Sequence, residues 1–448
     1  MLSLEAAQDR ASALVDRARR AGADAADAAY VADASESIQV RLGKLEDVER
    51  SEGEHISLRV FIGQRSASIG SSDLGDAALD ELAARAVDMA RAAPEDRFAG
   101  LAPAELLAAA PFVDLDMTDP AEPSPQALRA AAEAAEDAAR AVAGVTNSDG
   151  AGASAGRAVF ALATSHGFAG GYETTSHGLS ASVVAGEDAG KQRDYAWRQA
   201  RHRDALPSPQ EIGALAGTRA VARLDPGRVK SGPLPVVFDP RVGGTLVGHL
   251  VGAMSGPSIA RRSSFLLDRQ DERLFDSSVV LVENPHLARG LRSRPFDGEG
   301  LPTAPRHLVE GGRITGWLME SASARQLGET PTGHASRGHG GAPGVSVTNL
   351  HLAAGSATPA ELMADIADGI YVTELIGHGV NGVTGDYSRG ASGFRIVKGA
   401  LAGPIAEFTI AGNLIDMFAA MIPANDLEWF RAINVPTIRI DGMTIAGD

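Results

Sequence analysis

The stretch Gly243-Gly-Thr-Leu-Val-Gly-His-Leu-Val-Gly-Ala-Met-Ser-Gly256 lies just past the middle of this 448-residue chain. Its apolar side chains recur at helical spacing and predict a helix over Val242–Met254. After this helix the chain is rich in glycine, and short strand-like runs follow one another toward the C-terminus. The segment therefore predicts a helix set into a large, mostly β domain over residues 227–448.

Two smaller α+β units are predicted before that domain, over residues 1–105 and 106–226. The first closes with a helical period over Asp76–Ala93, and the second contains helical patterns over Gln126–Val142 and Ser208–Leu224. Alternating segments predict antiparallel strands at Ala28–Ala32, Ser37–Leu42, His55–Ile62, Ser66–Ile69, Arg157–Thr164, Gly170–Thr175 and Gly178–Ala185. The fold class is therefore α+β.

Composition and charge exclude several classes of function. The formal net charge of −16 argues against nucleic acid and against an anionic membrane surface, because both need clustered Lys and Arg. The chain has no Cys, which excludes disulfides, thiol nucleophiles and Cys-based metal sites. Neither a signal-peptide pattern nor a run of about 18 apolar residues is present, so the cytoplasm is the expected location and no membrane contact is expected.

A serine-hydrolase signature, G-x-S-x-G, occurs once as Gly152-Ala-Ser154-Ala-Gly156. A nucleophile elbow places its Ser between a preceding strand and a following helix. Here a helix and a polar loop are predicted before the motif and a strand after it, so the context is reversed. We therefore do not predict Ser154 as a nucleophile.

Histidines raise the question of a metal site. His334 and His339 are five residues apart, and His351 and His378 follow. The segment Gly333–Gly344 is too rich in glycine to form a helix that would direct two ligands at one ion. No Glu follows a His as it does in zinc-protease helices. The pattern predicts ordinary core or surface histidines and no metal in this chain.

The chain resembles the TldD/PmbA family along nearly its whole length. The likeness includes the N-terminal helix-and-strand unit, and its most specific matches follow in the family's order. They are Gly243–Gly256, Arg261–Leu266, Glu374–Asn381, Thr384–Ser388, Gly393–Phe394, Ala411–Met417, Ala424–Glu428 and Gly442–Gly447.

The family has two branches, and the resemblance places this chain in the TldE/PmbA branch. In TldD-type chains the corresponding helix carries H-E-x-x-x-H, and a late Cys completes a zinc site. Those three motif positions are Gly248, His249 and Ala253 in this chain, and the Cys is missing. The resemblance therefore implies no catalytic residue and no cofactor in this chain, with zinc expected in a TldD-type partner.

The family further implies a role in a cytosolic TldD–TldE metallopeptidase complex that degrades or processes unfolded or short peptides. This chain would act as a structural partner that completes the cleft, and it could form a homodimer when the TldD-type subunit is absent. We expect His378, Asn381, Asp386 and Tyr387 at the cleft or at the partner contact.

Two alternatives remain open from the residues alone. One is an autonomous metal-dependent hydrolase that uses His334, His339 or His378 with Asp386 or Glu374. The other is a stand-alone regulatory protein of the gyrase-modulator type that acts through protein contacts.

Overall fold

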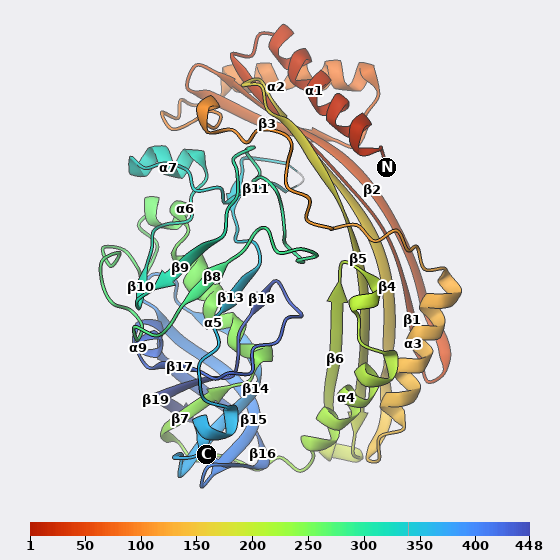
Figure 1. Cartoon of the computed structure of the whole chain (residues 1–448), viewed down its shortest axis with the longest axis vertical. Coiled ribbons are helices and arrows are strands. Elements are labelled where there is room, and N and C mark those ends of the chain that lie inside the picture. The colour runs from red at the N-terminus through yellow and green to blue at the C-terminus, as the bar shows by residue number, and fades with distance from the viewer. Residues whose placement is uncertain (339) are drawn as a thin grey trace.

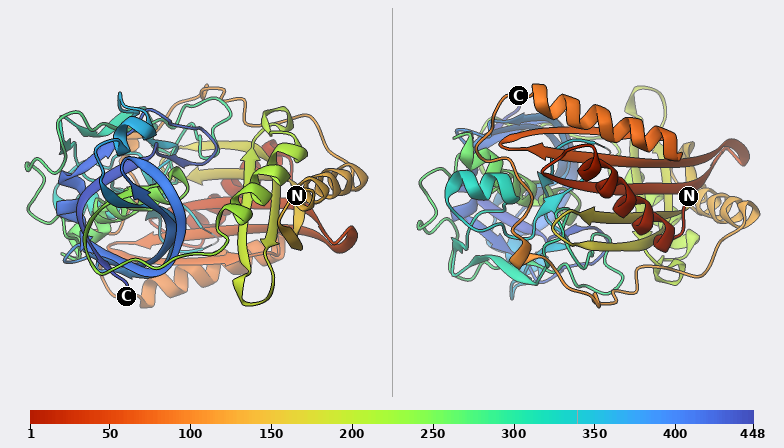
Figure 2. Two further views of the ribbon diagram at one scale, coloured as in Figure 1. Left: turned by 90° about the horizontal axis from the view of Figure 1, so that it is seen from below. Right: turned by 90° about the horizontal axis from the view of Figure 1, so that it is seen from above.

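The computed structural model describes residues 1–338 and 340–448 (Figure 1). The N-terminal half forms one long curved sheet with helices on its outer side, and the C-terminal half packs beside the inner side of that sheet (Figures 1 and 2). The two halves therefore meet along one face of the sheet.

The N-terminal sheet has six antiparallel strands in the order β3-β2-β1-β4-β5-β6. Their bounds are β1 Ala25–Arg41, β2 Lys44–Ile62, β3 Arg65–Ser71, β4 Val145–Thr164, β5 Ala169–Ala185 and β6 Gln192–Ala200. Pairing of β1 with β4 joins the two predicted N-terminal units into a single sheet. Each unit thus contributes three strands to one layer.

Several strands are longer than the sequence pattern predicts. The predicted strands Ala28–Ala32 and Ser37–Leu42 are parts of the single strand β1. Asp33, between them, pairs with Gly53 on one side and Ala158 on the other. Polar residues interrupt the apolar pattern there, but two flanking strands satisfy the backbone and keep it extended.

Helices cover the outer face of this sheet, as Figure 2 shows from above. Their bounds are α1 Leu4–Arg20, α2 Asp76–Ala92, α3 Pro125–Arg140 and α4 Pro209–Ala222, with short 3-10 turns η1 Ala104–Leu106, η2 Asp188–Gly190 and η3 Arg203–Ala205. Ser208 caps α4 in a capping box with Glu211. A Cβ on Gly213 of α4 would lie 2.1 Å from the carbonyl oxygen of Ala135, so glycine allows α4 to pack closely against α3.

The inner face of the sheet contacts the C-terminal half through a buried anchor. Phe296 is fully buried in an aromatic cluster with Phe112, Phe160, Phe168 and Tyr172. Beside it lies a buried ionic network, in which Asp27 of β1 contacts Arg59 of β2 and Arg337, and Arg59 also contacts Glu299. Both sets join sequence-distant segments and fix the two halves together.

The C-terminal half contains a six-stranded sheet in the order β16-β15-β14-β7-β19-β17, which closes on itself through β16–β19 pairing (Figure 2). Its strands are β7 Gly232–Phe238, β14 Asp368–Val380, β15 Asp386–Val397, β16 Ala400–Asn413, β17 Met421–Pro423 and β19 Ile438–Ala446. A second sheet has the order β10-β9-β8-β13-β18. Its strands are β8 Leu281–Glu283, β9 Arg306–Glu310, β10 Arg313–Ile314, β13 Leu350–Leu352 and β18 Ile433–Asn434.

The remaining C-terminal elements are short. They are α5 Pro240–Ala253, α6 Gly256–Ala260, α7 Ser321–Leu327, α8 Pro359–Met363, α9 Leu414–Ala419, β11 Ala335–Ser336 and β12 Gly344–Val345. The predicted α+β class with a large, mostly β third part is confirmed, while the boundaries near residues 105 and 226 stay predictions. No described helix is long and apolar enough to cross a bilayer.

Candidate functional site

Helix α5 contains the three positions that correspond to a zinc motif. Asp239 caps its start by accepting a 2.8 Å hydrogen bond from the N–H of Arg241, and Pro240 occupies its first turn. The buried side of α5 includes Leu246 and Leu250, and the helix packs against β14 and β7 of the closed sheet. The helix is therefore held firmly inside the C-terminal half.

The three motif positions have different environments. Gly248 is exposed, and a Cβ there would meet no atom within 4 Å. Ala253 is buried, and only His249 has a donor atom for a metal. One imidazole is fewer than the three or so protein ligands that zinc takes. Among the described residues, no group of three His, Asp or Glu side chains could hold a metal ion, so this donor set does not fit zinc.

His249 instead packs against Tyr387 of β15. The two rings meet edge to face, with centroids 6.2 Å apart. Neither the His249 Nε2 nor the Tyr387 hydroxyl has a hydrogen-bond partner among the described residues, and both atoms are buried. Burial, with a further contribution from the nearby Arg389 cation, lowers the pKa of His249. Burial also raises the pKa of Tyr387 above its ordinary value. The pair is neutral at physiological pH.

The β14–β15 hairpin carries the other predicted contact residues. His378 is exposed near the end of β14. Asn381 accepts hydrogen bonds from the N–H groups of Val383 and Thr384 and so shapes the turn. Asp386 accepts a 2.6 Å hydrogen bond from the Thr384 hydroxyl. These side chains build or flank a turn, while Tyr387 lies apart from them under α5. Their role in partner contact stays a prediction.

The residues of the autonomous-hydrolase alternative do not form a metal-binding group. His334 is buried, and its Nε2 lies 2.7 Å from Glu283, while its Nδ1 lies 2.8 Å from the Thr332 hydroxyl. Glu374, His378 and Asp386 share the β14–β15 hairpin, where Glu374 forms an ion pair with Arg223. His339 lies outside the residues that the structure describes. Among the described residues, no three of these side chains form a group that could hold a metal ion.

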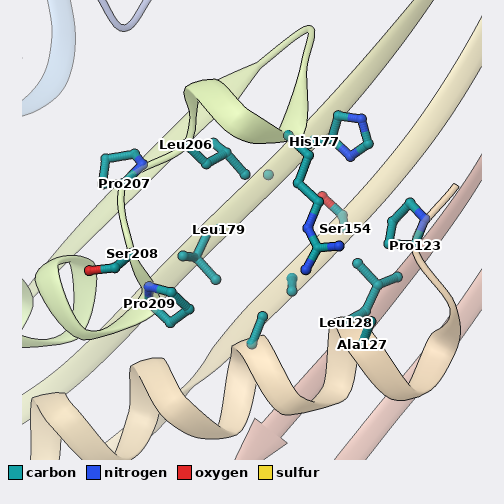
Figure 3. Close-up of a pocket in the computed structure, with 14 residues that line it drawn as sticks. Pro123, Ala127, Leu128, Ser154, His177, Leu179, Leu206, Pro207, Ser208 and Pro209 are labelled. Carbon is teal, nitrogen blue, oxygen red and sulfur yellow. The ribbon is translucent and has the colours of Figure 1, made fainter. Parts of the chain in front are cut away.

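Ser154 lies within strand β4, not in the loop that the sequence predicts. The G-x-S-x-G match reflects strand alternation: Ala153 faces the helix-covered outer side, whereas Ser154 pairs with Gly178 on the inner side. His177 pairs with Ala155 and thus points to the outer face, where its Nε2 lies 3.2 Å from Asp119. Although Ser154 and His177 both line the 230 Å³ pocket of Figure 3, their side chains project from opposite faces of the sheet.

Larger cavities lie where β6 approaches the C-terminal half. One of about 490 Å³ is lined by Arg198, Arg431 and Trp429, among others. A second of about 300 Å³ lies against the inner face of β4 and β5 and is lined by Arg201, Arg292 and Arg294. Sequence reasoning missed these arginines.

The sequence indicates these arginines by two short Arg-rich runs in an acidic chain, at residues 197–203 and 288–294. Only the fold places the two runs next to each other.

Family models match three consecutive parts of the chain. The PmbA/TldA metallopeptidase domain 1 matches residues 26–90. The central domain of the same family matches residues 118–224, and its C-terminal domain matches residues 231–447.

Individual relatives extend over almost the whole chain. Metalloprotease PmbA of Escherichia coli O157:H7 is 38% identical, over 95% of this chain and 92% of its own length. A PmbA homologue of Haemophilus influenzae is 34% identical over 97% and 94%. A solved structure from Bacteroides thetaiotaomicron, described as a proposed modulator of DNA gyrase, is 25% identical with a TM-score of 0.91 and covers 100% of both chains. TldE from Thermococcus kodakarensis shares the fold, with 18% identity, a TM-score of 0.86 and coverage of 97% and 99%.

Proposed function

The chain belongs to the PmbA/TldA metallopeptidase family, and from this membership we propose that it is the non-catalytic, TldE-type subunit of a two-chain peptidase. A TldD-type subunit supplies the zinc and the general base. The complex acts in the cytoplasm on unfolded or short peptides.

The observation that carries this proposal is the composition of α5. The helix keeps its cap, its buried face and its position against the closed sheet, yet Gly248 and Ala253 have no side chain that could bind a metal. A zinc-activated water needs about three protein ligands and an open coordination position. A chain that keeps the fold of the family but lacks these groups is suited to a structural role, in which it completes a cleft and stabilises its partner.

The exposed β14–β15 hairpin supports a partner contact. Ile376 is 59% exposed and Val383 is 56% exposed, and His378 lies between them in the sequence. Exposed apolar side chains on a surface loop are typical of protein contacts when they are grouped. In the proposed complex this hairpin faces the TldD-type subunit.

A mixing experiment tests the assignment. Unfolded peptide is offered to this chain alone, to a TldD-type subunit alone and to the two together, and hydrolysis is expected only in the mixture. Replacing the Glu of the partner's H-E-x-x-x-H motif should abolish hydrolysis, because that Glu is the general base. The matched change His249→Ala in this chain should leave the rate within about threefold, since one unpaired imidazole supplies no zinc site. Hydrolysis by this chain alone at the rate of the mixture would falsify the assignment.

A further inference from the structure

Two Arg-rich segments meet between the N-terminal sheet and the C-terminal half. Residues 198–200 and 287–291 line the 490 Å³ cavity, and their immediate neighbours Arg201 and Arg292–Arg294 line the 300 Å³ cavity. The two cavities are thus lined by consecutive residues of the same two segments. We call the region that holds both cavities the arginine cleft and define it by Arg198, Arg201, Arg292, Arg294 and Arg431.

Arg431 and Arg198 form the aromatic end of the arginine cleft. The Arg431 guanidinium lies 5.1 Å from the Trp197 ring centroid and donates one hydrogen bond of 2.7 Å to the carbonyl of Arg241. Its Nε is buried without a partner, and it forms no ion pair with a described residue. Arg198 stacks 4.2 Å from the Phe430 ring, and its one carboxylate neighbour, at 3.6 Å, is the exposed Glu428.

Arg201 bridges the two halves at the centre of the cleft. It donates hydrogen bonds to the carbonyl oxygens of Thr175, Gly290 and Leu291. Carbonyl groups satisfy the N–H donors of a guanidinium but carry no formal charge to compensate it. The positive charge of Arg201 is therefore left for another group to neutralise.

Arg292 and Arg294 form the other end. Arg294 also donates only to carbonyls, those of Ala335 and Ser346, each at 3.1 Å, and its Nε is buried without a partner. The Arg292 side chain is exposed and makes no hydrogen bond or ion pair with the described part of the chain. The exposed Arg292 guanidinium is therefore accessible to a ligand.

This clustering contrasts with the rest of the molecule. The formal net charge is −16, and several arginines elsewhere form ion pairs with carboxylates, as Arg439 does with Asp365 and Asp441. A recess that gathers five guanidinium groups, of which only Arg198 forms an ion pair with a described carboxylate, creates a local positive potential and attracts anions. Carboxylates suit guanidinium groups because two parallel hydrogen bonds can form.

The shape of the cleft suits an extended chain. Strand β6 is the last strand of the N-terminal sheet, and Arg198, Gln199 and Ala200 of β6 line the larger cavity (Figure 1). An edge strand offers unpaired backbone groups to an added strand. On the inner face of the neighbouring strands β4 and β5, Ser154 has a small side chain and Gly178 has none, which leaves room for a polypeptide.

We propose that the arginine cleft binds an extended peptide segment that carries carboxylates, either on acidic side chains or at a free C-terminus. The peptide runs beside the edge of β6, and the guanidinium groups of the cleft pair with the carboxylates of the peptide. The inference rests on the proposed function, because it names which peptides the subunit would hold for the complex.

Binding to the full chain alone tests the inference. Four fluorescent peptides of about six residues, the usual length of a strand, combine Glu or Gln side chains with a free or an amidated C-terminus. Fluorescence anisotropy should show the peptide with no carboxylate binding at least about tenfold more weakly than the peptide with both kinds. The two intermediate peptides identify which carboxylate source matters. Affinity for the acidic peptides should fall as salt is added.

Substitutions of arginines in the cleft test whether the peptide binds there. Arg292→Gln and Arg431→Gln should each weaken carboxylate binding by about threefold to tenfold and leave the all-amide peptide unchanged. Arg292→Lys keeps the charge and should retain most of the affinity. Arg85 of α2 is also exposed and forms no ion pair with a described residue, so Arg85→Gln is the matched control and should bind as the native chain does. Because the Arg292 side chain has no hydrogen bond or ion pair to lose among the described residues, its variants test the cleft even where Arg431→Gln unfolds.

Three results would overturn the inference. They are equal affinity for carboxylate and amide peptides, tighter binding of single-stranded DNA than of the acidic peptide, and a dimer in light scattering that Arg292→Gln dissolves. The assay needs no partner, so its failure leaves the mixing experiment intact. Conversely, charge-selective binding without hydrolysis in the mixture would reject the proposed function alone.

Discussion

At the scale of single residues, helix α5 supplies one imidazole, that of His249, because Gly248 and Ala253 have no donor atom. His249 stands at the position that the family resemblance aligns with the motif Glu, and its ring packs edge to face on Tyr387. Two buried polar atoms of this pair, the His249 Nε2 and the Tyr387 hydroxyl, have no hydrogen-bond partner in the described part of the chain. Unsatisfied buried groups carry a desolvation cost, so this pair weakens the fold locally.

Removing the Tyr387 hydroxyl should therefore not destabilise the protein. For Tyr387→Phe we expect a free energy of unfolding that is unchanged or higher by about 1 kcal/mol, because no hydrogen bond is lost. Tyr30 is the control, since its hydroxyl accepts from the N–H of Leu2 and donates to Glu54, both at 2.9 Å. Tyr30→Phe should cost about 1 kcal/mol. Urea unfolding measures both, and a loss of stability in Tyr387→Phe would reveal a partner for that hydroxyl.

Helix α5 is held in place by the contacts of one of its sides. Its buried side packs in the main C-terminal core, whereas its outer side presents Gly248 and Gly252, where an added Cβ would meet open space. Glycine inside a helix destabilises it relative to alanine through greater backbone freedom in the unfolded chain. Tertiary packing of the buried side, more than helix propensity, therefore holds α5 in place.

Alanine at this outer position should stabilise the helix. Gly248→Ala is expected to raise the free energy of unfolding by about 0.5–1 kcal/mol, since nothing there obstructs a methyl group. Gly213→Ala in α4 is the matched control and should destabilise, because its Cβ would lie 2.1 Å from the Ala135 carbonyl oxygen. Thermal unfolding compares the two, and equal shifts of Tm for both variants would contradict the packing described.

At the scale of the whole molecule, one short segment supplies several of the buried contacts that hold the two halves together. Phe296 enters the aromatic cluster on the sheet, and Glu299 reaches the buried Arg59. Asp297, between them, is 1% exposed, and burial together with the nearby Glu299 raises its pKa to about 6. Ionisation at this position is therefore linked to the docking of the halves.

This linkage predicts a pH dependence with a definite sign. The folded state holds the Asp297 proton up to about pH 6, while the ordinary pKa is 3.8, so folded protein binds more protons between these values. The stability contributed by this group should be greatest below about pH 4 and fall as pH rises to about 6, by an amount on the order of 2 kcal/mol. Urea unfolding across this range, compared with Asp297→Asn, measures it. A native-minus-variant difference that stays flat or rises with pH would contradict the prediction.

The sequence by itself determined the class of the fold, the main helices and the lack of donor atoms at two positions of helix α5. These depend on local features: apolar spacing predicts α2 and α3, and the residue types at Gly248, His249 and Ala253 are readable directly. Glycine and alanine have no donor atom in any conformation, so their lack of metal ligands needs no structure.

Only the tertiary structure decided which distant residues share a site. The sequence predicts a polar loop before Ser154 and a strand only from Arg157, whereas pairing on both sides makes this segment part of β4. Arg201 reaches carbonyls 89 and 90 positions away, so no local pattern could indicate the arginine cleft. The physical reason is that strand pairing and charge compensation depend on contacts between sequence-distant segments, whereas helix and strand periodicity depend on neighbours in the chain.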